Sequence, residues 1–266
     1  MSFSRISLLA LASFAACAAQ AQAAPLGNDL LAPQTIVPIT FVKGVSANRA
    51  KPGDAVLART TQAVRLSDGQ ELKSGAEVLG HVVNVQSAVV DKTPYAKRAV
   101  SVLAIQFDTL SAHNEKIPLH VTVRALADVF ATSAAVEPRP SDEDPLHRTT
   151  QIGGDIVTPS QSEIVNGVGD TVGHNKKGGN FARLIANVGT GNLRCDSSST
   201  EQPVSVFSAS ACGMYGFSGM SFSIPDAGLS SSGFALSSGH RAAEIPRYSS
   251  ALLEVLPDST GSSSSR

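Results

Sequence analysis

Between residues 35 and 123 the chain alternates hydrophobic and polar positions with a period of two, as half-buried β-strands do. In the segment IPLHVTVRAL, for example, Ile117, Leu119 and Val121 fall on one face, and His120 and Thr122 fall on the other. Turn-forming pairs such as Pro-Gly and Asp-Gly interrupt the pattern about every ten residues, a spacing typical of sandwiches and barrels. We therefore predict an all-β fold, either a small curved barrel or a sandwich.

Two glycines and one proline refine this prediction. Gly75 is placed in a turn, where glycine adopts a left-handed backbone at little cost. Gly80 lies inside a strand with two apolar faces, where a glycine marks a bulge, a bend or the close approach of another backbone. We favour the curvature of a barrel as the reason, with a ligand against the backbone as the alternative. Pro38 cannot donate to a ladder, so its strand is predicted to be an edge.

The pattern is lost after Leu126. Residues 136–179 are rich in Pro, Gly, Asp and Thr and have no sustained period, which predicts a long, flexible and disordered linker insertion. The linker separates a β core at residues 30–135 from a β-rich part at residues 180–257, whose strands are predicted to complete the same core. The Ser-rich residues 258–266 are predicted to be a disordered tail.

A short apolar strip with helical spacing follows the linker. Asn180 can cap a helix there, and Gly189 can end it. We predict a helix of two turns that packs onto the β core through Phe181, Leu184, Ile185 and Val188.

The first residues decide the compartment. Arg5, a short apolar run and the small residues of AQAQAA form a signal peptide at residues 1–23. Two alternatives stay open, a retained N-terminal anchor and a lipid anchor at Cys17, but we favour cleavage. No later segment is long and apolar enough to span a bilayer. The mature chain is therefore expected in the periplasm or outside the cell.

Charge and cysteine content narrow the function. The formal net charge is −1 and 16% of the residues are charged, so no basic footprint for nucleic acid is present. Two cysteines follow the signal, Cys195 and Cys212, and an even pair in an exported chain predicts a disulfide. A metal site is the alternative, and Asp196 and Glu201 are the ligands it would have nearby.

The candidate chemistry is sparse. The segment GVGDTVG, residues 167–173, has the wrong spacing and context for a dinucleotide loop. His81 is interpreted as a satisfied, partly buried core histidine. The densest polar group is His240 with Ser238, Arg241 and Glu244, which we interpret as a loop cluster. We therefore predict no catalytic, cofactor-binding or metal-binding residues and no cofactor.

Residues 53–123 contain an Asp-Gly turn, a Leu-Lys-x-Gly turn and a strand that ends in Phe-Asp-x-Leu. The residues are Asp68, Gly69, Leu72, Lys73, Gly75 and Gly80, followed by Phe107, Asp108, Leu110 and Ile117. This order resembles the C-terminal domain of TrbI-like conjugation proteins, the β-barrel components of the type IV secretion outer channel. The resemblance implies a β-barrel. Members of that family keep a transmembrane helix, whereas a cleaved signal is expected here.

Two classes of function remain. The first is an exported, non-enzymatic cell-envelope β-domain protein with a structural or binding role, whose partner is another cell-envelope protein. The alternative is a secreted hydrolase or glycan-binding protein with a site assembled from distant residues, since such sites are defined by geometry and not by sequence order.

Overall fold

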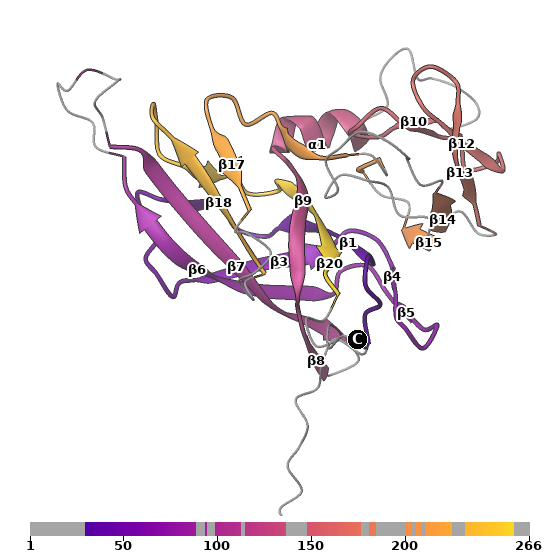
Figure 1. Cartoon of the computed structure of the whole chain (residues 1–266), viewed down its shortest axis with the longest axis horizontal. Coiled ribbons are helices and arrows are strands. Elements are labelled where there is room, and N and C mark those ends of the chain that lie inside the picture. The colour runs from indigo at the N-terminus through magenta and orange to yellow at the C-terminus, as the bar shows by residue number, and fades with distance from the viewer. Residues whose placement is uncertain are drawn as a thin grey trace, which may run out of the picture.

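The structure, a computed structural model, describes ten stretches of the chain: residues 30–88, 94, 99–112, 115–136, 148–176, 181–184, 201–203, 206–208, 211–224 and 232–257. The signal at residues 1–23, with Cys17, the tail at residues 258–266 and Cys195 lie outside the described residues. The predicted all-β class is confirmed, because strands dominate and curl into a nearly closed, barrel-like sheet (Figure 1).

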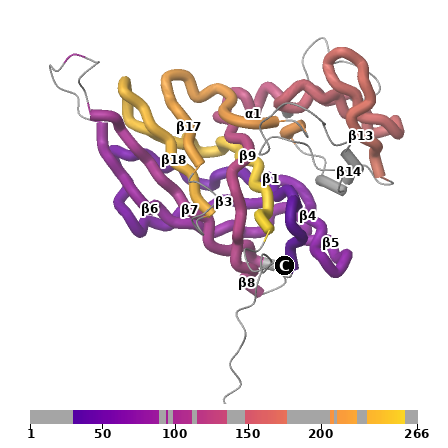
Figure 2. The backbone as a smooth tube through the Cα atoms, in the orientation of Figure 1, coloured from indigo at the N-terminus to yellow at the C-terminus, as the bar shows by residue number. Residues whose placement is uncertain are grey.

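Ten strands form the main sheet. Their order is β16 (Gly213–Tyr215), β9 (Val121–Ala127), β20 (Ser250–Val255), β1 (Ile36–Phe41), β3 (Ala55–Thr60), β6 (Glu77–Gln86), β7 (Ser101–Ala112), β18 (Gly233–Ser238) and β17 (Ser221–Ser223), with β8 (Glu115–Pro118) also paired to β7. Neighbours are antiparallel except β16 and β9, which are parallel. Strands from both halves of the chain thus share one sheet, and Figure 2 shows its curvature along the tube.

A serine ties the two sides of the curved sheet together. The Ser232 hydroxyl, directly before β18, donates to the carbonyl of Leu119 at 2.6 Å and accepts from the backbone N–H of Val121 at 3.0 Å. Inside, Phe107 stacks on Phe234 with ring centroids 6.0 Å apart, and Phe41 lies 6.3 Å from Phe107. Apolar side chains from both halves of the chain therefore fill one core.

Both glycine predictions are confirmed. Gly75 has a φ of 88° in the turn before β6. At Gly80 the register between β6 and β7 shifts, and a Cβ atom there would collide with the carbonyl oxygen of Gln106 and lie 3.2 Å from the Phe107 Cα. The glycine is required because β7 approaches the backbone of β6 closely at the bulge.

The edge prediction for the strand at residues 35–42 is wrong. β1 pairs with β20 on one side and with β3 on the other. Pro38 is tolerated because its carbonyl accepts the Thr61 N–H at 2.9 Å, just beyond the end of β3. The ring nitrogen of Pro38 faces the same side, so no ladder bond to β20 is lost.

A second sheet has the order β10 (Thr149–Thr150), β11 (Ile156–Val157), β12 (Glu163–Val165), β13 (Thr171–Asn175), β14 (Phe181–Leu184) and β15 (Glu201–Pro203). The described part of the predicted linker, residues 148–176, therefore contains short strands that periodicity did not predict. These strands are too short to show a hydrophobic period in the sequence, and tight turns connect them. Residues 167–173 include such a turn, in which Gly169 has a φ of 95°.

The helix predicted at residues 180–191 is wrong for its described part. Phe181–Leu184 is strand β14, because Leu184 pairs with Gly173 of β13 and Phe181 with Pro203 of β15. Pairing with neighbouring strands overrides the helical spacing. The short helix in the described residues is α1 (Val129–Val136), where Asp128 accepts the Ala131 N–H at 2.8 Å as a cap.

Residues that follow β9 in the chain pack against one side of this strand. Every residue of this strand is buried, and two of them, Ala125 and Ala127, belong to a second apolar cluster with Ile152, Phe207 and Ala211. Arg124 of β9, which is also buried, donates to Glu254 of β20 at 3.3 Å. Burial raises the pKa of the Glu254 carboxyl above its usual 4.5, and Arg124 opposes that rise.

Candidate functional site

The polar cluster around His240 is a folded turn. The Ser238 hydroxyl donates to the carbonyl of Gly219 at 2.9 Å and accepts the backbone N–H groups of His240 and Arg241, each at 3.3 Å. With both its donor and its acceptor capacity used by the backbone, this hydroxyl shapes the loop, as the sequence interpretation held.

His81 is hydrogen-bonded and partly buried, as predicted, but it does not lie in the core. It forms a pair with Asp108, Nδ1 to carboxylate oxygen at 2.8 Å, and both side chains are more than a third exposed on the outer side of β6 and β7. A carboxylate on Nδ1 orients an imidazole as in hydrolytic sites. No hydroxyl or thiol of the described residues is hydrogen-bonded to this ring, and within the same residues no three metal-ligating side chains come together.

Cys212 precedes β16, and its N–H donates to the Tyr215 hydroxyl at 3.2 Å. Because Cys195 lies outside the described residues, the bridge between the two remains a prediction. Lys92 and Lys97, in the segment between β6 and β7, also lie outside the described residues. No helix in the described ranges has the length and apolar character needed to cross a membrane.

A hollow open to solvent lies along a small two-stranded ribbon. β2 (Val45–Ser46) pairs there with β19 (Glu244–Ile245). The ribbon is attached to the core, since Ala47, Ala243 and Ile245 are fully buried and the Ala47 N–H donates to the carbonyl of Ala243 at 2.9 Å. A groove of about 640 Å³ follows the ribbon, and a second hollow of about 190 Å³ adjoins it on the side of β3. Together we call these two hollows the ribbon groove.

Local sequence explains the shape of the ribbon groove. Gly44 lets the segment before β2 approach the segment after β19. A Cβ at this position would lie 3.1 Å from the backbone nitrogen of Arg247 and 3.2 Å from the carbonyl oxygen of Ile245. On the other segment, Tyr248 has a φ of 68°, which is rare for a bulky residue, and its N–H donates to the Phe41 carbonyl at 2.9 Å. The turn is therefore held in a strained conformation, and Tyr248 is 52% exposed there.

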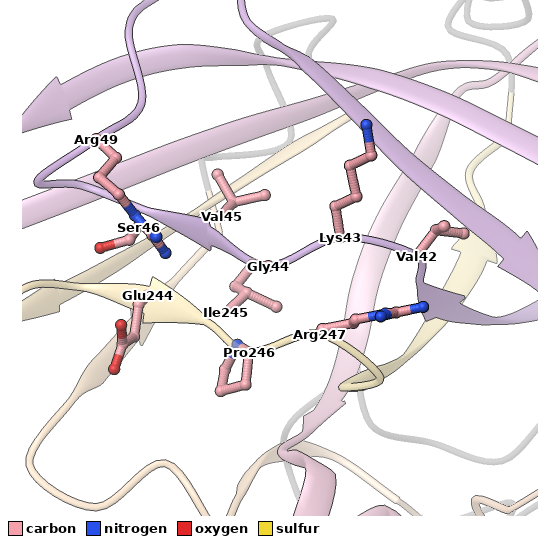
Figure 3. A pocket seen from close by; sticks show the side chains of 10 residues that line it. All are labelled: Val42, Lys43, Gly44, Val45, Ser46, Arg49, Glu244, Ile245, Pro246 and Arg247. Atoms are coloured by element: carbon pink, nitrogen blue, oxygen red, sulfur yellow. The ribbon is translucent and has the colours of Figure 1, made fainter.

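Three cations line the ribbon groove: Lys43, Arg49 and Arg247 (Figure 3). All three are exposed, and none forms an ion pair with another residue that the structure describes. The carboxylate of Glu244 is the acidic group of the larger hollow, and Arg241 lies 4.0 Å from it. The local balance is therefore positive, although the whole chain is nearly neutral.

The guanidinium of Arg247 is held in position by an aromatic ring. Its carbon lies 4.3 Å from the centre of the Tyr248 ring, a cation–π contact. Figure 3 shows the side chains of Lys43, Arg49 and Arg247 pointing in different directions from separate segments. The charges are thus distributed along the groove and do not converge on one atom.

Sequence reasoning missed the ribbon groove. Lys43 and Arg49 flank a two-residue strand, and Arg247 follows a proline almost at the other end of the chain. No spacing connects them, because only the pairing of β2 with β19 brings them together. The pair of adjacent residues Arg247 and Tyr248 was the one local signal.

No family model matches the chain, and no curated protein or solved structure matches it either. The resemblance to TrbI-like proteins therefore remains a prediction.

Proposed function

We propose that the chain is an exported, non-enzymatic β-domain protein of the cell envelope that binds another envelope component through the ribbon groove. The observation that carries this proposal is the set of three cations without ion pairs in the described chain, Lys43, Arg49 and Arg247, on a ribbon anchored in the barrel core. The signal sequence supports export, and the resemblance to TrbI-like proteins agrees with an envelope location.

The size and charge of the ribbon groove suit a ligand. Its larger hollow falls in the range of about 300–1,000 Å³ that is common for binding sites. Cations that form no ion pair attract an anionic group at long range and form charge-assisted hydrogen bonds at contact. Because the groove is open to solvent, added salt should weaken the interaction.

Site-specific crosslinking in intact cells tests the proposal. We expect a photoreactive benzoylphenylalanine in place of Tyr248 to crosslink to an envelope component, whereas the same residue in place of Lys116, exposed on β8, should not. Adding Arg49→Gln and Arg247→Gln should reduce the yield from position 248 by about tenfold, since each removes a charge from the groove. Equal crosslinking from both positions, or a yield that the two substitutions leave unchanged, would contradict the proposal.

One observation favours the second candidate, a secreted hydrolase. The pair of His81 and Asp108 has the orientation of a general base. If the pair is catalytic, His81→Gln should reduce the hydrolysis of chromogenic ester or glycoside substrates by about 100-fold or more, with no change in melting temperature. Equal activity of the variant and the wild type would exclude this role.

A further inference from the structure

Resting on the proposed function, we infer that the ribbon groove binds an anionic glycan, a linear sugar polymer whose rings carry carboxylate or phosphate groups. The inference starts from charge. Arg49 and Arg247 present planar forks that match a carboxylate or a phosphate, and Lys43 adds a point charge. Two acids line the groove as well, and the three cations outnumber them. Glu244 in the larger hollow lies 4.0 Å from Arg241, and Asp54 in the smaller one accepts the backbone N–H of Lys51 at 2.8 Å.

The extent of the groove favours a polymer over a single small anion. The two hollows share the segment from Lys43 to Ser46 and the side chain of Arg49, so they continue around β2. The cations come from three places along this path and do not converge. A single phosphate or carboxylate would engage only part of the set, whereas a chain with repeated charges can engage all of it.

The Tyr248 ring favours a sugar. Tyr248 is half exposed and contacts Arg247, which lines the groove, and its backbone is fixed by a positive φ and by the hydrogen bond to Phe41. The negative face of an aromatic ring attracts the polarised C–H groups of a sugar ring. Arg247 covers one face of this ring, which leaves the other face for a sugar, and because Arg247 is already held there it loses less side-chain freedom when it binds an acidic group.

Two other classes of partner fit less well. A peptide that adds a strand needs a long open edge, but β2 and β19 contain two residues each. A flat anionic membrane would contact the rim of the groove and leave Gly44 and Val45, which line it, unused.

The test measures binding of oligogalacturonate, and separately of a phosphomannan, to the purified mature protein by fluorescence anisotropy. Methyl-esterified oligogalacturonate is the matched neutral probe. We expect binding of at least one acidic probe and none of the neutral one. Arg247→Gln and Arg49→Gln should each weaken binding by about tenfold, and Tyr248→Asn, which tolerates the positive φ, should weaken it by about fivefold. Lys116→Gln should change it less than twofold.

Several outcomes would overturn the inference. They are equal binding of the esterified probe, an equal effect of Lys116→Gln and the groove variants, and binding of phosphatidylglycerol vesicles but of neither glycan. If both glycans fail to bind while position 248 still crosslinks specifically in cells, the glycan inference is wrong and the proposed function stands. If the crosslink is absent too, both are wrong.

Discussion

Gly80→Ala is expected to lower the free energy of unfolding by about 3 kcal/mol, a large effect for the addition of one methyl group. The new Cβ would collide with the Gln106 carbonyl oxygen, so β7 would have to move away from β6. Phe107 would move with it, and this side chain is 1% exposed and stacks on Phe234 in the core.

Urea denaturation measures this change, and Gly239→Ala is the matched control. Gly239 has no heavy atom within 4 Å of its Cβ position and no positive φ, so its substitution should change stability by less than about 0.5 kcal/mol. If Gly80→Ala is as stable as Gly239→Ala, the bulge is not a constraint on the barrel.

Cys212→Ser is expected to lower the free energy of unfolding by about 3 kcal/mol, because a bridge from Cys195 closes a loop of moderate length. Cys212 directly precedes β16, the short strand that pairs with β9, so the bridge would also hold that strand against the barrel. Cleavage of the predicted signal would remove Cys17 and leave two cysteines in the mature chain.

Thiol titration of the denatured, non-reduced protein checks the bridge, and thermal unfolding of the variant checks its effect. We expect no free thiol in the wild type and a lower melting temperature in Cys212→Ser. Two titratable thiols would contradict the bridge and return the pair to the metal-site interpretation, with Asp196 and Glu201 as nearby ligands.

The barrel was predictable from sequence where local chemistry determines it. The Asp-Gly turn at Asp68 and Gly69 joins β4 (Val64–Arg65) to β5 (Glu71–Leu72), as the pattern predicted. Gly80 was informative because a glycine inside an apolar strand has few explanations other than a bulge. Pro38 led to a wrong prediction of an edge strand. The cost of its missing N–H depends on which neighbouring strand the ring nitrogen faces, and the sequence alone does not show this.

The candidate site was not predictable because it depends on contacts between distant segments. Periodicity could not detect β2 and β19, which are two residues long, and charge counting could not detect a patch in a chain of net charge −1. The same limit applies to β14, whose strand conformation comes from its neighbours β13 and β15. The ribbon needs a partner almost at the other end of the chain, and β14 needs partners before and after it that its own spacing does not reveal.

Amide hydrogen exchange, measured with and without a soluble extract of the cell envelope, tests the central claim most directly. If the ribbon groove is the binding site, peptides that cover residues 42–49 and 244–249 should exchange more slowly with the extract, because bound ligand restricts local opening there. Peptides from β8 should be unchanged, and Arg49→Gln with Arg247→Gln should abolish the protection. Protection confined to other surfaces, or unaffected by these two substitutions, would contradict the account.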